Sequence, residues 1–319
     1  MTQNDSTMVY SGRAVRFDDF GGVEVLHIGH VSVGPPGPGE VVVRVAAAGT
    51  NPGEIPIRTG ALESRYPSKL PQGQGTDFAG VVVAVGPKID APSFSVGDEV
   101  MGWSDKRSSQ AEYVLVPSNH LVIKPAELSW PVAGSLFVVA VTAYAAVRAV
   151  QVAPGDTVVV SSAAGGVGSI VVQLLKSKGA RVIGLASAAN HDWLRSVGAT
   201  PVDYAGDDLA GRIRAAAAGE VDALIDTHGP EYLDLGVELG INPERIETII
   251  AYEAAARVGA KAEGSSTASS AGILGEMAAL VADGTITVPI AATYPLDEVG
   301  AAYTELAERH TRGKIVLLT

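Results

Sequence analysis

The chain has 319 residues, of which 47% are hydrophobic and 18% charged, and its formal net charge is −12. This composition supplies a sizeable core and, at ordinary domain sizes, two domains, while the acidic balance argues against binding to nucleic acid or to an anionic membrane. The chain contains no cysteine, which excludes disulfides, thiolate zinc sites and a cysteine nucleophile.

The N-terminal part alternates short valine-rich runs with Gly/Pro clusters. The first eight residues are expected to be frayed, and residues 1–10 lack the basic and apolar regions of a signal peptide, so a cytoplasmic location is expected. The prolines of VSVGPPGPGE (31–40) indicate loops between antiparallel strands. We therefore expect a β-rich domain with few helices up to about Lys124, irregular over residues 51–75.

From residue 125 onward the pattern changes to alternating helices and strands. Residues 133–150 predict a buried, alanine-rich helix that is too short and interrupted to span a membrane. Strands are then expected at 157–161, 181–185, 201–203, 221–226, 245–250 and 257–262, with helices at 190–197, 207–217, 231–240, 270–282 and 296–307. Repeated βαβ units with short connections predict an α/β fold with a doubly wound parallel sheet.

The last strands predicted, 287–290 and 314–318, have no place in that parallel sheet. We therefore expect the chain to return to its first domain. The predicted boundaries are residues 1–124 with 286–319 for the β-rich domain, and 125–285 for the parallel-sheet domain.

A glycine-rich turn follows the first strand of the parallel sheet. It fits the pattern G-x-G-x-x-G, with Ala163 in the first place, Gly165 in the second and Gly168 in the third. Gly165 would let the backbone approach a pyrophosphate, and Gly168 would let the following helix pack closely on the strand. The flanking strand and helix are both predicted, which is the context that a dinucleotide site requires.

The choice of nucleotide depends on the end of the next strand. A carboxylate there binds the ribose 2′-hydroxyl of NAD, whereas this strand ends in Ala186 and Ser187, with no acid before Asp192. This favours NADP, with His191, Arg195 and Lys178 as candidates for charge near the 2′-phosphate. An equally acceptable interpretation is that Ser187 caps the next helix, and both can hold together.

These segments together resemble the zinc-independent quinone oxidoreductase branch of the medium-chain dehydrogenase/reductase superfamily. The matching segments occur in family order: AAAGTNPGE (46–54), IRTG (57–60), GTDFAGVVVAVG (75–86), VGDEVMG (96–102), AEYV (111–114), PVAG with TAY (131–144), SSAAGGVGSIVVQLLK (161–176), VDALIDTHG (221–229) and RGKIVL (312–317). The resemblance implies a GroES-like catalytic domain, a Rossmann cofactor domain, and NADPH as cofactor.

The resemblance also implies roles for individual residues. Asn51 and Thr142 would lie near the nicotinamide as catalytic residues. The cofactor-binding residues would be Ala164, Gly165, Gly166, Val167 and Gly168 at the pyrophosphate, Ser187, Arg195 and Tyr204 at the adenine-side phosphate, Thr227 under the adenine or ribose, and Tyr252 near the carboxamide. It further implies a homodimer, paired through the last strands near residues 245–262.

The substrate side departs from the family pattern. Pro56 stands where many quinone reductases carry a tyrosine, Glu54 stands where aspartate is common, and His228 replaces a small apolar residue. Pro56, Tyr66, Trp103 and Phe137 are the candidates for a flat apolar pocket, although each aromatic residue is also compatible with ordinary packing. His27 and His30 fall on opposite faces of a predicted strand, so no metal site is expected.

The expected activity is hydride transfer from NADPH to a quinone or an α,β-unsaturated carbonyl compound without a metal, for which the cofactor supplies the reactive group. Asn51 is a candidate donor to the developing oxyanion, although Asn-Pro is also a common turn signal. Two alternatives remain open: an enoyl-thioester reductase of a biosynthetic pathway, and an NADP-binding scaffold with a structural, regulatory or cyclase role.

Overall fold

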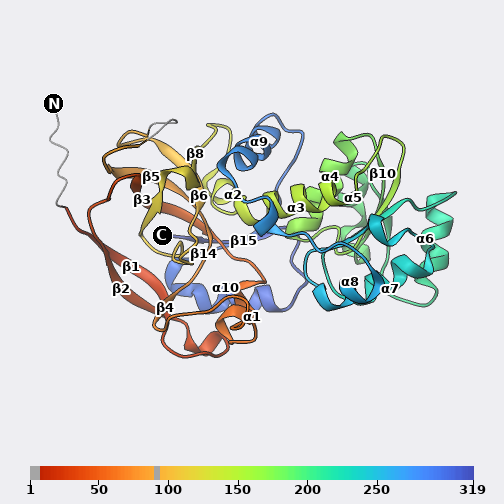
Figure 1. The fold of residues 1–319 in the computed structure, drawn as a ribbon, viewed down its shortest axis with the longest axis horizontal. Helices are drawn as coiled ribbons and strands as arrows, with labels where there is room; N and C mark the ends of the chain where they lie inside the picture. The colour runs from red at the N-terminus through yellow and green to blue at the C-terminus, as the bar shows by residue number, and fades with distance from the viewer. Residues whose placement is uncertain (1–7, 90–93) are drawn as a thin grey trace. The chain divides into compact units, whose positions relative to one another are not determined.

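A computed structural model describes residues 8–89 and 94–319. The fraying expected of the first eight residues therefore lies, apart from Met8, outside the described residues. The chain forms two compact units (Figure 1): Met1–Val138 with Ser270–Ala282 and Ile290–Thr319, and Val139–Ser269 with Asp283–Pro289. The domain boundaries expected from the sequence stay a prediction.

The first unit is built on two β-sheets. Its strands are β1 (Tyr10–Phe17), β2 (His27–Val33), β3 (Glu40–Gly49), β4 (Gln72–Gly73), β5 (Asp77–Val85), β6 (Glu99–Trp103), β7 (Tyr113–Pro117), β8 (Leu121–Ile123), β14 (Ile290–Pro295) and β15 (Lys314–Leu318). The small sheet has the order β2-β1-β4, and the larger one the order β14-β15-β3-β5-β6-β8, with β7 also paired to β3. Alternate valines of β3, Val41, Val43 and Val45, are buried in a core shared with Phe78 of β5.

The end of the chain completes the larger sheet. β15 pairs antiparallel with β3, with Val316 opposite Gly49, and Figure 1 shows the blue β15 in this unit. The helices of the unit are α1 (Glu54–Arg58), α2 (Trp130–Ala133), α9 (Ala271–Ala282) and α10 (Val299–Ala307). α10 buries Tyr303 against Ile315 and Leu317 of β15, so the last segment belongs to the core of this unit.

The second unit is the predicted doubly wound parallel sheet. Its strands are β9 (Thr157–Val160), β10 (Arg181–Leu185), β11 (Thr200–Val202), β12 (Ala223–Asp226) and β13 (Ile246–Thr248). All four pairings are parallel, and the order β11-β10-β9-β12-β13 reverses direction at β9, as in dinucleotide-binding sheets. The fold class expected from the sequence is confirmed.

α3 (Phe137–Ala149) leads into this unit. The helices that contact the strands of the sheet are α4 (Gly166–Ser177), α5 (His191–Ser196), α6 (Leu209–Ala217), α7 (Glu231–Glu238) and α8 (Tyr252–Val258). α4 buries an apolar face that includes Ile170, Val171, Leu174 and Leu175. After it, Gly179 takes a φ of +83°, the left-handed conformation that commonly ends a helix.

Several predicted elements differ from the structure. The helix expected over 133–150 starts at Phe137 as α3, and residue 133 ends the short helix α2. Between them Gly134 packs so close to β3 that an added Cβ would meet the Ala47 carbonyl at 2.5 Å. The strand expected over 287–290 lies later, as β14 at Ile290–Pro295. The strand expected over 257–262 is wrong: residues 252–258 form α8, ended by Gly259 at φ +77°, and Lys261 makes one isolated bridge to Glu247. The irregular stretch 51–75 contains the short helix α1.

Candidate functional site

The glycine-rich turn joins β9 to α4 in the second unit. Ser162 adopts a φ of +45°, and its carbonyl accepts the Gly165 N–H at 2.9 Å. An added Cβ on Gly168 would lie 2.2 Å from the same carbonyl oxygen, so only glycine lets the helix start this close to the turn. The Ala163 N–H donates to the Leu185 carbonyl at 3.0 Å, which ties the turn to β10.

The start of α4 fits a pyrophosphate group. Residues 164–165 lead into the helix, and by helix geometry the N–H groups of Gly166, Val167 and Gly168 have no acceptor within the helix. The first turn of α4 carries no acidic side chain, so nothing there opposes an anion. The free N–H groups and the positive end of the helix dipole would hold the diphosphate of a dinucleotide.

A buried carboxylate fixes the strand ends beside this turn. Asp226, the last residue of β12, is fully buried, and its Oδ1 accepts the Ser161 hydroxyl at 2.6 Å and the N–H groups of His228 and Gly229. Its Oδ2 accepts the Thr248 hydroxyl at 2.7 Å. One side chain therefore organises the carboxyl ends of β9, β12 and β13, where ligands of parallel α/β sheets bind.

Ser187 lies just beyond the end of β10. It occupies the N-cap position of the turn Ala188–Asn190, but its hydroxyl makes no capping hydrogen bond within the described chain. Instead Oγ accepts Nδ2 of Asn190 at 3.2 Å. Nε2 of His191 lies 3.2 Å from the Ala186 carbonyl oxygen, so His191 is close to the strand end where Ser187 lies.

Two further residues predicted at the adenine side are exposed. The guanidinium of Arg195 is paired with the carboxylate of Asp192 at 2.7 Å on the surface of α5. Tyr204 follows β11 and is 43% exposed. Neither side chain is buried by the protein, so both are accessible to a ligand.

The other predicted site residues of the second unit, Thr227 and Tyr252 for the cofactor and Thr142 for catalysis, lie at separate points of the structure. Thr227 is next to the turn, because its hydroxyl donates to the Ser161 carbonyl and its N–H to the Ser161 hydroxyl, both at 2.8 Å. Tyr252 is the first residue of α8, with its hydroxyl donating to the Ile249 carbonyl at 3.2 Å. Thr142 is buried in α3.

Asn51 belongs to a buried polar cluster in the first unit. Its Oδ1 accepts the Lys314 ammonium at 2.6 Å, while its Nδ2 donates to Asp77 at 3.1 Å and to Glu54 at 3.5 Å. Lys314 also donates to the Thr50 carbonyl at 2.7 Å. The amide of Asn51 is therefore held in one orientation, with oxygen toward an ammonium and nitrogen toward two carboxylates.

Burial changes the proton affinities of this cluster. Desolvation raises the pKa of Glu54 to about 6 and raises that of Asp77. It lowers the pKa of Lys314, against the attraction of the two carboxylates. The hydroxyl of Tyr303 donates to Glu54 and accepts Nε2 of Gln110 at 2.8 Å, and burial raises its pKa. Burial therefore favours the neutral forms of Glu54, Asp77 and Lys314, and the ion pairing within the cluster opposes this effect.

The candidates for an apolar substrate pocket differ in burial and surroundings. Trp103 and Phe137 stack with ring centroids 4.2 Å apart and an interplanar angle of 3°, but they are only 5% and 3% exposed. Tyr66 is exposed beside Arg65, and Pro56 lies in α1. The structure therefore brings together Trp103 and Phe137, as a packed pair.

Sequence reasoning noted Glu54 only as a departure from the family pattern and missed Asp77, Tyr303 and Lys314 as site residues. Their contacts join residues up to 264 positions apart, so no local spacing reveals them. A signal was present: Asp77 and Lys314 each open an otherwise apolar strand, and a charged residue in a buried strand needs a partner.

The parts of the chain that the structure describes contain no group of three or more metal-ligating side chains. In the same residues no helix has the length and apolar character needed to cross a membrane.

Comparison with known families matches both parts of the chain. The family described as "Alcohol dehydrogenase GroES-like domain" matches residues 37–126. The family described as "Zinc-binding dehydrogenase" matches residues 197–317. The first match falls within the first unit. The second match covers β11, β12 and β13 of the parallel sheet and then β14 and most of β15 of the first unit.

Individual proteins are similar over much of the chain. The rat synaptic vesicle membrane protein VAT-1 homolog is 35% identical over 68% of this chain and 54% of its own length, and human quinone oxidoreductase is 38% identical over 54% of this chain and 52% of its own. The chain thus spans about half the length of these curated relatives. The solved quinone oxidoreductase of Coxiella burnetii is 29% identical, with a TM-score of 0.87 over 97% of this chain and 100% of that one.

Proposed function

Because the chain belongs to the medium-chain dehydrogenase/reductase superfamily, as a quinone oxidoreductase-like member, we propose that it is an NADPH-dependent reductase of quinones or α,β-unsaturated carbonyl compounds. The reaction class is supported by the similar proteins of human and Coxiella burnetii, which are named quinone oxidoreductase. The preference for NADPH is supported by this chain's own residues.

The observation that carries the NADPH preference is the end of β10. Ala186 and Ser187 stand where an NAD-binding sheet presents a carboxylate to the ribose 2′-hydroxyl. The next acid, Asp192, is paired with Arg195, so its charge is partly compensated. A 2′-phosphate would meet a hydroxyl and the amide of Asn190 rather than an unpaired carboxylate.

Bound NADPH would supply the hydride, and the chain's own residues would hold and shield the reactants. In the second unit, α4 would hold the diphosphate, and Asp226 would keep the neighbouring strand ends in place. In the first unit, Lys314, Asp77 and Glu54 engage the amide of Asn51. Asn51 would therefore act as a fixed dipole, and the proton for the product would come from another group.

The test uses the purified chain. Fluorescence titration should give at least tenfold tighter binding of NADPH than of NADH, and absorbance at 340 nm should fall when a quinone or enone is added to the NADPH complex. Tighter binding of NADH would contradict the phosphate assignment. Binding of NADPH without any loss of absorbance would contradict the reductase and favour the non-redox scaffold, whereas turnover of acyl thioesters far above free enones would select the enoyl-thioester reductase.

We also propose a homodimer. The segment expected to pair, residues 245–262, contains β13 and an isolated bridge instead of two strands. Sedimentation velocity at micromolar concentration should give a mass near twice 32.6 kDa, and a monomer at all concentrations would contradict this part of the proposal.

A further inference from the structure

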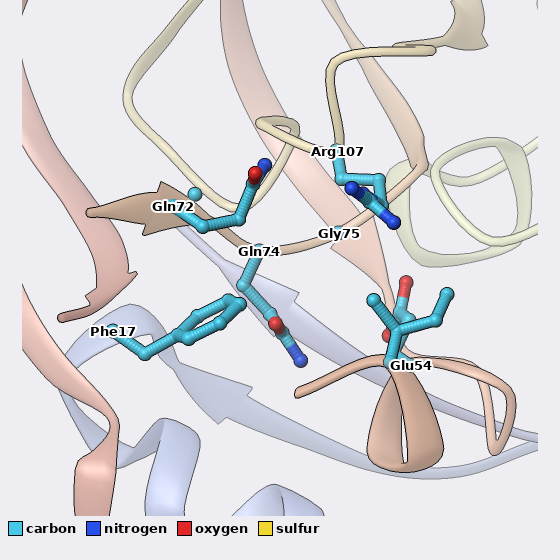
Figure 2. A pocket seen from close by; sticks show the side chains of 8 residues that line it. Phe17, Glu54, Gln72, Gln74, Gly75 and Arg107 are labelled. Carbon is cyan, nitrogen blue, oxygen red and sulfur yellow. The ribbon is translucent and has the colours of Figure 1, made fainter. Parts of the chain in front are cut away.

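A small pocket in the first unit is bordered by the buried amide of Gln74. Gln74 is only 3% exposed, and among the described residues its Nε2 has no acceptor at full hydrogen-bond geometry. The amide lies close enough to the Tyr303 hydroxyl to lower the pKa of that group, and it still has N–H capacity to donate a further bond. Figure 2 shows Gln74 beside the pocket with Glu54, Gln72 and Arg107, which come from separate segments. Because buried amide N–H groups are nearly always satisfied, by protein or by ordered water, this atom indicates an occupant.

The pocket has the size of one water molecule. Its free volume is about 10 Å³, close to the smallest volume that holds a single internal water. Phe17 and Ile57 supply apolar walls, and Glu54 and Gln74 supply polar ones. An organic ligand would therefore have no room without rearrangement of these side chains.

The other polar side chains at the pocket are already engaged. Arg107 donates to the carbonyls of Tyr66 and Pro67, and the amide of Gln72 donates to the Lys106 carbonyl at 3.0 Å. Glu54 differs. Its Oε2 accepts two hydrogen bonds, from the Asn51 N–H and the Tyr303 hydroxyl. Within the described chain its Oε1 accepts only one long hydrogen bond, 3.5 Å, from Nδ2 of Asn51. At the pocket, Nε2 of Gln74 can therefore still donate a hydrogen bond, and Oε1 of Glu54 can still accept one.

The occupant must accept one hydrogen bond and donate another. A cation cannot accept from Gln74, and an anion would be repelled by the Glu54 carboxylate. Water does both. We propose that the pocket is a hydration site in which one internal water accepts from Nε2 of Gln74 and donates to Oε1 of Glu54.

This water has a consequence for Glu54, which is 5% exposed. A donor to the carboxylate stabilises its charged form and so keeps its pKa lower than burial alone would. The other charged and titratable groups facing Glu54 are Tyr303 from α10, Asp77 from β5, Lys314 from β15, Arg58 on its own helix and Arg107 across the pocket. Of these groups, Tyr303 also interacts with the Gln74 amide, which lowers its pKa.

The first test is a crystal structure of the unmodified chain at a resolution that shows internal waters. An ordered water within hydrogen-bond distance of Nε2 of Gln74 and of Glu54 is expected. A dry pocket, or a Gln74 amide bonded directly to protein atoms, would overturn the proposal. This test does not depend on the activity or on any variant.

The second test measures the titration of Glu54 in solution by ¹³C NMR of labelled glutamate, with Glu54→Gln identifying its signal. Gln74→Leu removes the donor and fills the pocket, so the pKa of Glu54 should rise by about one unit. Gln72→Leu is the matched control, because this amide faces Lys106 instead, and it should leave the pKa unchanged. Equal pKa values in the two variants would contradict the water bridge.

Discussion

Ser161 and Asp226 join the ends of two central strands, through a hydrogen bond of 2.6 Å from Oγ of Ser161 to Oδ1 of Asp226. The same Ser161 oxygen accepts the Thr227 N–H at 2.8 Å. The Ser161 hydroxyl therefore links the buried Asp226 carboxylate to the backbone N–H of Thr227, the residue that follows β12. The shape of the candidate dinucleotide site depends on this pair.

Asp226→Asn should destabilise the chain by about 2–4 kcal/mol. All four hydrogen-bond partners of the carboxylate are donors. The amide NH₂ of asparagine would therefore face a donor where the carboxylate oxygen accepts one. NADPH affinity should fall as well. Urea unfolding followed by circular dichroism measures the first effect, and fluorescence titration the second.

Asp222 offers a matched control. It lies at the opposite end of the same strands, where Oδ2 accepts the Thr157 N–H at 2.7 Å. Asp222→Asn should cost about 1 kcal/mol and leave NADPH affinity unchanged. Equal losses of affinity in the two variants would contradict a specific role for Asp226.

The two glycines of the turn should respond differently to substitution by alanine. Gly168→Ala would place a methyl group 2.2 Å from the Ser162 carbonyl oxygen, so it should cost roughly 1–3 kcal/mol, as overpacked sites do. Gly165→Ala meets its nearest atom, Oγ of Ser162, at 3.0 Å, and should keep the fold while weakening NADPH binding. A Gly168→Ala variant stabilised by its better helix propensity would show that the turn relaxes.

Ser187→Asp should reverse the cofactor preference. A carboxylate at this position would repel a 2′-phosphate and accept a ribose hydroxyl, so the ratio of NADPH to NADH affinity should fall by about 100-fold. Ser196→Asp introduces the same charge on α5, where Ser196 is exposed, and should change the ratio little. Retention of the NADPH preference in Ser187→Asp would contradict the assignment of the phosphate site.

Glu247 should make stability depend on pH. It is 0% exposed in β13, its Oε1 accepts the Glu263 N–H at 2.7 Å, and its Oε2 has no hydrogen-bond partner among the described residues. Burial raises its pKa from 4.5 to about 8. Between pH 4.5 and about 8, Glu247 binds a proton in the folded chain but not in the unfolded one. The free energy of unfolding therefore falls as the pH rises through this range, and it is constant at higher pH.

Glu247→Gln removes this titration and should flatten the pH dependence by about 2–4 kcal/mol across that range. Chemical unfolding at pH 5, 6, 7 and 8 checks the slope. Glu244→Gln is the control, because Glu244 is an exposed partner of Lys261 and its loss should shift stability by less than about 1 kcal/mol. A wild-type slope in Glu247→Gln would show that Glu247 is ionised in the folded chain.

Lys314→Met should be strongly destabilising. It removes the ammonium that Asp77 and Asn51 face and leaves buried carboxylates without a counter-charge, at a cost of about 3–5 kcal/mol. Combining it with Asp77→Asn should recover part of the loss, which thermal unfolding of the single and double variants would measure. An additive double variant would show that the two side chains do not interact.

Local patterns in the sequence predict the second unit well. The β-branched run of β9, the glycines of the turn and the apolar face of α4 follow one another along the chain, so spacing alone defines the βαβ unit. The strand predicted at 257–262 is wrong because Ala254, Ala255 and Ala256 favour a helix, and that helix continues to Val258.

The polar cluster of the first unit could be predicted only in part. Asn51 was identified through the family resemblance, but the partners that fix its amide come from β5 and from β15, at separations of 26 and 263 residues. Such contacts are set by sheet pairing, and the pairing of β15 with β3 cannot be read from either strand alone. Trp103 and Phe137 stack on each other, a contact that sequence spacing does not reveal, and their role at a substrate pocket stays a prediction.

The position of Lys314 in the last strand imposes an order on assembly during synthesis. A ribosome produces the chain from its N-terminus, and domains fold as units, so the parallel sheet is complete once Thr248 has emerged. The first unit is translated earlier but must wait for β15, which supplies both a strand and the cation for Asp77. The unit whose strands are made first is therefore completed after the parallel sheet, and its carboxylates remain without their ammonium partner until Lys314 has been made.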